Sequence, residues 1–533
     1  MQKQPIRLIL MAAILLLFMG GMMVQLFSIM HKTKVTEVSV KQGQYHLHIP
    51  LSAGMIYDSD FVPLNQSEEE ILAVVNPTPQ AMASIFTKLR DRDAVNAQLQ
   101  ERSPFVCELN EDARSTADLY ILHGRRKKKG ILPAQHLLGY RQNGVPTAGL
   151  ELAFADWLTA CDTFADVTFT VSGVGEVLAG AEQSMICSGQ SGGGIVTTLN
   201  ADIQQIAENA LQQISPAAGA AVVMECSTGN IAACASTPVY DPDALAGSLD
   251  RDDAPFLNRA LSAYSVGSVF KLVTASAALE SGIPVKHMYK CTGEISVYGQ
   301  RFRCHQRSGH GLMDMQQAML NSCNPYFISL STFLTPEAMH DTAAALGFGT
   351  ETILANGLVS ASGYLPDTKE LQVEAEKANM SFGQGKLLAT PLQVTAMTAC
   401  IANKGIYSKP KLFRGLTADG KTLLADQPAE QYRALSEKTA AYVRRMMVTA
   451  IEKSETTKAK PENTRAGGKT STAQTGSFDA DGNELNHAWI TGFFPVNNPK
   501  YAVTVFVEYG GYGNQAAAPV FRRIIEQITD KQL

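Results

Sequence analysis

The chain is poor in charge and in aromatic residues for its length. Charged residues make up 18% of its 533 residues, aromatic residues make up 7%, and the formal net charge is −5. A charge balance so close to neutral argues against a general nucleic-acid binder, which carries a basic surface. The hydrophobic fraction of 45% is typical of a folded protein. At this length we expect two or three domains rather than one core.

The sequence also lacks an internal repeat and a regular array of metal ligands. Its nine cysteines are scattered, without the short spacings that a metal-binding motif has. We therefore expect no metal ion and no cofactor. Cys291 and Cys304 flank a hairpin-like stretch and are candidates for a disulfide outside the cytoplasm. The alternative interpretation is that both are unpaired thiols.

Charge is absent from a long apolar run near the N-terminus, between Leu8 and Met30. Such a run is long enough to cross a bilayer as a helix of roughly 20 residues. It has neither the shorter apolar region nor the A-x-A-like exit of a cleaved signal peptide. Basic residues, including Lys3 and Lys32, lie on both flanks, so the positive-inside rule is nearly balanced. We expect residues 1–34 to be a cytoplasmic tip and a single membrane anchor, with the remaining chain outside.

The rest of the chain divides at a Ser/Gly-rich connector around Ser188–Gly194, a composition typical of flexible linkers. We predict a non-catalytic domain over residues 35–190 and a second domain over 191–533. Residues 35–50 alternate apolar and polar side chains as half-buried strands do. From Glu69 to Leu99 the apolar positions follow a helical period.

Beyond the connector, strands are mixed with well-marked helices. Apolar segments over 220–224 and 231–235 are joined by a turn at Ser227–Asn230, which predicts a hairpin. Further strands are predicted over 469–474, 488–494 and 501–509, and helices over 201–214, 436–453 and about 517–528. This pattern indicates an α+β domain whose sheet is bracketed by helices.

One stretch carries the clearest chemistry. Ser268 stands at the predicted first turn of an apolar helix, and Lys271 follows it three residues later. Residues at i and i+3 share a helix face, so the spacing places a nucleophile beside its base. Ser408 and Lys411 have the same spacing, but Pro410 removes a helical hydrogen bond from that turn. We interpret the second stretch as a loop.

Two further motifs follow Ser268 and Lys271 in the chain. Ser322–Asn324 is an S-x-N triplet, and Lys469–Thr472 places a lysine and hydroxyls on a predicted strand. S-x-x-K, S-x-N and K-T-G are the motifs of penicillin-binding proteins and serine β-lactamases. The chain resembles this superfamily in the order of all three.

The flanking sequence extends the resemblance. Ser381–Gly385 and His487–Trp489 resemble landmarks of the catalytic domain, while Ile56–Asp58 and His136–Tyr140 resemble the pedestal of class B, monofunctional penicillin-binding proteins. This family implies an anchor helix, an elongated β-rich pedestal and a β-lactamase-like transpeptidase domain. We find no room for a separate glycosyltransferase domain, which disfavours the bifunctional class.

The resemblance implies a role for each motif residue. Ser268 would attack the carbonyl between two terminal D-alanines of a peptidoglycan stem peptide and form an acyl-enzyme. Lys271 would be the base, since burial lowers the pKa of an amine. Ser322 would relay a proton to the departing D-alanine, and Asn324 would bind the substrate amide.

The strand motif would bind the other end of the substrate. Lys469, with the hydroxyls of Thr470 and Thr472, would hold the substrate carboxylate. The backbone N–H groups of Ser268 and Thr472 would stabilise the oxyanion. Ser471 stands where the family usually has glycine, which permits close backbone approach. We expect this serine to modulate the reactivity of the enzyme rather than to abolish it.

The resemblance also implies partners and leaves alternatives. Stem peptides ending in D-Ala-D-Ala would be substrates, penicillin and other β-lactams covalent inhibitors, and a polytopic glycan polymerase a partner in the cytoplasmic membrane. A D,D-carboxypeptidase or a β-lactamase would pass the acyl group to water instead of an amine. A catalytically weak β-lactam sensor or scaffold is the alternative from another class, suggested by Ser471.

Overall fold

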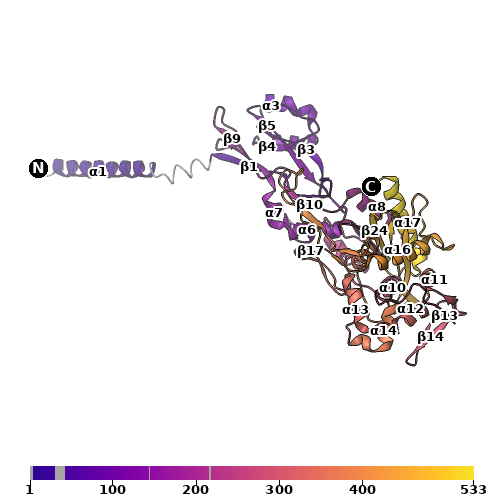
Figure 1. The fold of residues 1–533 in the computed structure, drawn as a ribbon. Coiled ribbons are helices and arrows are strands. Elements are labelled where there is room, and N and C mark those ends of the chain that lie inside the picture. Colours follow the sequence, from indigo (N-terminus) through magenta and orange to yellow (C-terminus); the bar gives the residue numbers. More distant parts are fainter. Residues whose placement is uncertain (1–3, 31–42, 143, 215–217) are drawn as a thin grey trace. The chain divides into compact units, whose positions relative to one another are not determined.

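The computed structural model describes residues 4–30, 43–142, 144–214 and 218–533 (Figure 1). The chain forms two compact units. An N-terminal unit contains Met1–Ala53, Glu68–Arg126 and Asp162–Ser191, and a C-terminal unit contains Gly54–Ser67, Lys127–Cys161 and Gly192–Leu533. The two units are thus interleaved along the sequence. The predicted division into two contiguous domains, 35–190 and 191–533, concerns parts that fold independently, and it stays a prediction.

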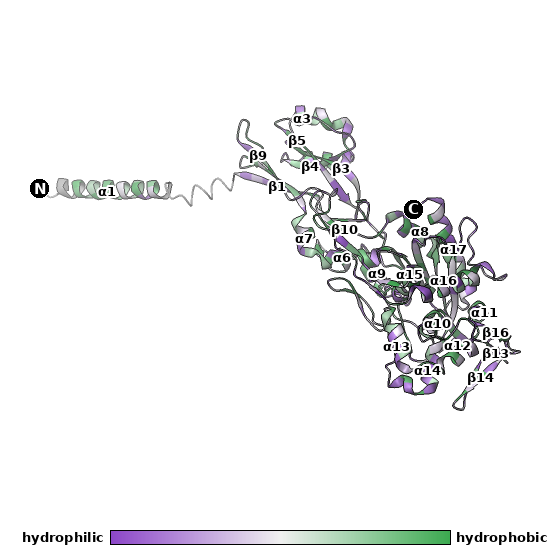
Figure 2. Cartoon of the chain, viewed as in Figure 1, coloured by the Kyte–Doolittle hydropathy of each residue, from purple (hydrophilic) through white to green (hydrophobic). Residues whose placement is uncertain are grey.

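The apolar N-terminal run forms one long helix, α1 (Gln4–Met30). Its segment Ile9–Ser28 has a mean hydropathy of 2.3, and none of it is buried within the protein (Figure 2). A predominantly apolar helix of this length that is exposed along Ile9–Ser28 fits a membrane anchor. The flanking lysines Lys3 and Lys32 and the predicted strand from Val35 to residue 42 lie outside the described residues.

The N-terminal unit is built on two three-stranded sheets, with strand orders β1-β8-β9 and β4-β3-β5. The strands are β1 (Gln44–Ser52), β8 (Thr163–Thr170), β9 (Gln183–Ser188), β3 (Gln66–Val75), β4 (Phe105–Leu109) and β5 (Leu119–Lys127). Short helices α3 (Pro79–Ile85) and α4 (Arg92–Leu99) pack on the second sheet.

The helix predicted from Glu69 is wrong for its first part, because Gln66–Val75 is strand β3. Ala73 and Val75 pack into one apolar cluster, while Leu72 and Val74 pack into another. Both faces of the strand are therefore buried, and a strand buried on both faces reads as a continuous apolar run. Pairing with β4 and β5 overrides the helical period.

The core of the C-terminal unit is a five-stranded antiparallel sheet of strand order β12-β11-β24-β23-β22. These strands are β11 (Gly219–Glu225), β12 (Ile231–Thr237), β22 (Gly467–Phe478), β23 (Glu484–Phe494) and β24 (Tyr501–Val507). The predicted hairpin and the three predicted C-terminal strands are confirmed. Segments 282 residues apart meet at the sheet centre, where Val222 pairs with Thr504.

Helices cover both faces of this sheet, as the α+β prediction requires (Figure 1). Alternate side chains of β11 divide between the faces: Ala221 and Val223 pack with one apolar cluster, Val222 and Met224 with the other. The first cluster contains α8 (Ala201–Leu211) and α17 (Gly513–Asp530); the second contains α10 (Lys271–Glu280), α15 (Pro391–Ala402) and α16 (Glu437–Glu452).

Candidate active site

Ser268 and Lys271 lie at the start of α10. A 3₁₀ turn over Gly267–Phe270 carries Ser268 and leads directly into the α-helix that Lys271 begins. In a 3₁₀ turn residues i and i+3 eclipse one another, which places both side chains on one side. Nearly all of α10 is buried, so the lysine is carried into the protein interior.

The turn that carries Ser268 is held by hydrogen bonds from elements distant in sequence. The Gly267 N–H donates to the Gly383 carbonyl at 2.8 Å, and Trp489 Nε1 donates to the Ser265 carbonyl at 3.0 Å. Gly383 has a φ of +80°, and a Cβ there would lie 2.0 Å from the Gly267 carbonyl oxygen. Only glycine permits this close approach, so the position of the turn is tightly fixed.

Lys271 is fully buried and binds the S-x-N triplet. Its Nζ donates to the Ser322 carbonyl at 2.7 Å, to Ser322 Oγ at 3.1 Å and to Asn324 Oδ1 at 2.5 Å. Burial, followed by the like charge of Lys469, holds the pKa of Lys271 well below its usual value. Burial thus makes the neutral amine of Lys271 more accessible than that of an exposed lysine.

Ser322 links the two lysines to Ser268. Its Oγ lies 3.1 Å from Ser268 Oγ, 3.1 Å from Lys271 Nζ and 3.1 Å from Lys469 Nζ. A hydroxyl has one donor site and two acceptor sites. The Ser322 hydroxyl uses all three of its sites in this arrangement. Ser322 itself has a φ of +50°, a left-handed conformation that non-glycine residues seldom adopt. The connection from Lys271 to Ser268 runs through this hydroxyl.

Lys469 lies on β22, with its ammonium directed at the same serine. Its Nζ also donates to the Thr470 carbonyl at 2.8 Å. Burial lowers the pKa of Lys469 to about 8. Thr470 and Thr472 alternate with the buried Lys469 and Ser471 along the strand, and Thr472 Oγ1 accepts a hydrogen bond from the Gly513 N–H at 3.2 Å. All predicted site residues therefore meet in one place.

An open cleft of about 430 Å³ lies over these residues. It is lined by Ser268, Arg303, Cys304, His305, Arg307, Ser322, Asn324, Phe382, Gln384, Thr470, Ser471, Thr472, Gln474, Tyr512 and Asn514. The sequence prediction missed the basic loop around Arg303 and Arg307 and the exposed ring of Tyr512. Their own spacing carries no motif, and only the fold brings them to the nucleophile.

The second S-x-x-K stretch lies elsewhere. Ser408 ends strand β19 (Ile406–Ser408), and its hydroxyl donates to the Ser227 carbonyl at 3.3 Å. The residue thus belongs to a strand rather than to the predicted loop. Because no helical turn joins it to Lys411, the spacing has no catalytic geometry.

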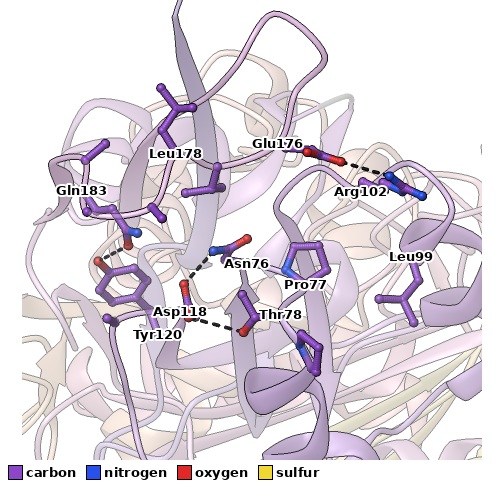
Figure 3. Close-up of a pocket in the computed structure, with 16 residues that line it drawn as sticks. Asn76, Pro77, Thr78, Leu99, Arg102, Asp118, Tyr120, Glu176, Leu178 and Gln183 are labelled. Atoms are coloured by element: carbon purple, nitrogen blue, oxygen red, sulfur yellow. Dashed lines mark hydrogen bonds and ion pairs between the residues drawn. The ribbon is translucent and has the colours of Figure 1, made fainter.

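The N-terminal unit contains a larger hollow of about 850 Å³ (Figure 3). Its polar side chains bind one another: Asn76 Nδ2 and Thr78 Oγ1 both donate to Asp118, and Tyr120 donates to Gln183. The described residues that line it include no serine, cysteine, lysine or histidine. The chemistry of the described residues therefore points to the cleft over Ser268.

Comparison with known proteins agrees with this geometry. The model of the penicillin-binding protein transpeptidase domain matches residues 219–526, more than half of the chain. The chain belongs to the penicillin-binding protein transpeptidase family. The peptidoglycan D,D-transpeptidase PbpA of Mycolicibacterium smegmatis is 33% identical over 367 residues, which are 63% of this chain and 72% of that relative.

Solved structures of penicillin-binding proteins share the fold. A ceftriaxone acyl-enzyme complex of penicillin-binding protein A from M. tuberculosis matches with 26% identity and a TM-score of 0.63, over 76% of this chain and 92% of that one. A chain from a peptidoglycan synthase complex that coordinates polymerization and crosslinking matches with 23% identity and a TM-score of 0.67, over 97% and 98% of the two chains. The predicted class B resemblance is confirmed.

Ser471 is the departure of this penicillin-binding protein from the family motif. Its side chain is buried, and its Oγ donates to the Val266 carbonyl at 2.8 Å. It packs beside Gly267, where a Cβ would lie 2.5 Å from the Ser471 hydroxyl. The extra hydroxyl thus binds the turn that carries the nucleophile.

We predict that Ser471→Ala destabilises this turn. The substitution removes the partner of a buried carbonyl, which costs about 1–3 kcal/mol, and it leaves the backbone otherwise unchanged. The free energy of unfolding, measured in denaturant, should fall by that amount. Ser477→Ala, an exposed serine on the same strand, is the control and should change it by less than about 0.5 kcal/mol. Equal effects of the two variants would contradict the assigned contact.

Proposed function

We propose that the protein cross-links peptidoglycan by serine acyl transfer, with Ser268 as the nucleophile. The observation that carries the proposal is the hydrogen-bond chain from the buried Lys271 through Ser322 to Ser268 Oγ. Ser268 would attack the carbonyl between the two D-alanines of a stem peptide. The D-alanine leaves, and an amine of a neighbouring stem then takes the acyl group from the serine oxygen.

Lys271 supplies the base. A neutral amine in this buried position takes the hydroxyl proton of Ser268 as the oxygen attacks. Because Ser322 Oγ lies within 3.1 Å of both groups, the proton can pass through its hydroxyl. Once Lys271 is neutral, the Ser322 hydroxyl can donate to Lys271 Nζ and accept from Ser268 Oγ. The same hydroxyl then delivers a proton to the departing D-alanine nitrogen.

Substrate binding falls to both walls of the cleft. Asn324 Oδ1 accepts from Lys271, which leaves the amide NH₂ to donate to the substrate backbone. Lys469 is buried, but it stays cationic below its pKa of about 8. It therefore attracts the terminal carboxylate of the substrate. The hydroxyls of Thr470 and Thr472 complete this carboxylate site.

The oxyanion is assigned to the backbone N–H groups of Ser268 and Thr472. Ser268 stands in the first turn of a helical segment, whose N–H groups have no acceptor within the helix. Such groups also attract negative charge. Two donors that are fixed before the reaction stabilise the tetrahedral intermediate without reorganisation.

The anchor and its surroundings define where this chemistry takes place. Helix α1 fits a single membrane span. We propose that the N-terminus lies inside and the cleft outside the cytoplasmic membrane, because the proposed stem-peptide substrates belong to the cell wall. A polytopic glycan polymerase of the same membrane is the proposed partner. The matched peptidoglycan synthase complex supports this pairing by analogy.

Replacing the nucleophile gives the primary test. Ser268→Ala should lower covalent labelling of the full-length protein by fluorescent penicillin by several orders of magnitude, because no other group can form the acyl bond. Ser408→Ala, which alters the second S-x-x-K stretch, is the matched control and should label normally. Labelling of Ser268→Ala at the wild-type rate would refute the proposal.

The fate of the adduct separates the related activities. A long-lived adduct and cross-linked stem peptides are expected for a transpeptidase. Rapid release of the label would indicate a β-lactamase, and release of D-alanine without cross-links would indicate a carboxypeptidase. Normal labelling without either product would indicate a sensor.

The two lysines predict the pH dependence of acylation. The rate should fall at low pH, where Lys271 takes up a proton and is lost as a base. It should fall again above about pH 8, where Lys469 loses the charge that holds the carboxylate. In Lys469→Arg the alkaline decline should move beyond about pH 10, since guanidinium stays protonated. Both declines can be measured by stopped-flow acylation with a β-lactam across the pH range. An alkaline decline that does not move in Lys469→Arg would contradict the role of Lys469.

A further inference from the structure

Three of the scattered cysteines meet a histidine beside the active site. Cys291 ends strand β13 (Tyr289–Cys291), and Cys304 follows strand β15 (Gln300–Arg303). His310 precedes strand β16 (Gly311–Met313), and Cys323 is the residue before helix α12 (Asn324–Ser331). Their ligand atoms all lie within 4.8 Å of one another. The expectation from spacing that the cysteines form no ligand array is therefore wrong for these three.

The separation of Cys304 and His310 suits a tetrahedral metal ion. Bonds of about 2.3 Å to sulfur and about 2.0 Å to nitrogen place neighbouring ligand atoms roughly 3.5–3.8 Å apart in a tetrahedron. Cys304 Sγ and His310 Nδ1 lie 3.5 Å apart. The three cysteines are buried, at 0–2% exposure, and all are free thiols. The disulfide considered for Cys291 and Cys304 is thus not formed in the structure.

The backbone around the cluster is shaped to bring these residues together. Gly309 has a φ of +81°, and a Cβ there would lie 2.3 Å from the Cys291 carbonyl oxygen. Gly293 has a φ of +100°, and its Cβ would lie 2.1 Å from the Arg307 carbonyl oxygen. The Cys304 N–H donates to the Gly293 carbonyl at 2.8 Å. Two glycine-dependent loops therefore enclose the four ligands.

We propose that Cys291, Cys304, His310 and Cys323 bind one Zn²⁺ ion as a structural site. Four ligands with three sulfurs and one imidazole nitrogen form the closed coordination set of structural zinc. Soft thiolates select zinc over the hard cations magnesium and calcium. The paired strands β13 and β16 and the hairpin of β14 (Glu294–Val297) with β15 then form a small metal-held subdomain.

The site is joined directly to the catalytic motif, and this consequence rests on the proposed function. Cys323 is the middle residue of the S-x-N triplet, between Ser322 and Asn324. Cys304 lies in the cleft wall beside Arg303. Zinc bound to both cysteines would fix the triplet and the basic loop relative to each other. We assign Cys323 as a positioning residue for Ser322 and Asn324.

Metal analysis of the full-length protein tests the site. Protein purified in detergent with Zn²⁺ in the growth medium should hold one zinc per chain by atomic emission. Cys291→Ser and His310→Ala lie outside the catalytic motifs and should each lose the zinc. Cys400→Ser, a buried free cysteine of α15, is the matched control and should retain it. Zinc-free wild type that takes up none on addition of Zn²⁺, or a disulfide between cluster cysteines by mass spectrometry, would overturn the proposal.

Cobalt substitution tests the ligands without depending on the folding of a variant. Co²⁺ added to the metal-free wild type should give thiolate-to-cobalt charge-transfer absorption and tetrahedral d–d bands. A spectrum without thiolate charge transfer would refute the ligand set.

The link to catalysis has its own measurement. Removal of zinc from the wild type by a chelator should lower the rate of penicillin acylation, and Zn²⁺ should restore it. Ser268→Ala should hold one zinc and label with no penicillin, so failure of the metal site and failure of the proposed function are distinguishable. An unchanged acylation rate in the zinc-free protein would refute the positioning role of Cys323.

Discussion

The active site depends on one energetic constraint, the burial of an amine. A charged ammonium costs several kcal/mol to remove from water, and Lys271 is wholly buried at the start of an apolar helix. Three acceptors from the S-x-N triplet and a lowered pKa of Lys271 offset this cost. The same triplet also contacts Ser268. The groups that stabilise the buried lysine therefore also connect it to Ser268.

A second constraint is that these groups come from separate parts of the chain. The nucleophile turn binds the β22 strand through Ser471, β23 through Trp489 and the loop after α14 (Glu374–Ser381) through Gly383. Each contact ends on a backbone atom of the turn, so it fixes the position of the turn and leaves the Ser268 hydroxyl exposed to the cleft. Sites built on rigid elements in this way hold catalytic geometry with little reorganisation. The unusual serine of the K-T-G motif is part of this scaffold.

The cysteine and histidine cluster extends the same principle to the opposite wall. The S-x-N triplet begins with Ser322 in a left-handed conformation, which local sequence does not favour. The surrounding structure must therefore impose it, and Cys323 of the cluster is the next residue in the chain. A metal held there would hold Ser322, the residue proposed to relay the proton, without any contact with substrate.

Several features of this protein could be predicted from local sequence patterns. The anchor run, the apolar strands of the five-stranded sheet, the helix of Lys271 and the order of the three motifs all follow from periodicity and spacing, because these patterns arise from neighbouring residues. Tertiary structure alone decided that Gln66–Val75 is a strand, that Ser471 binds the nucleophile turn, and that Cys291, Cys304, His310 and Cys323 converge. These features depend on contacts between residues tens to hundreds of positions apart, and such contacts cannot be inferred from the spacing of neighbouring residues.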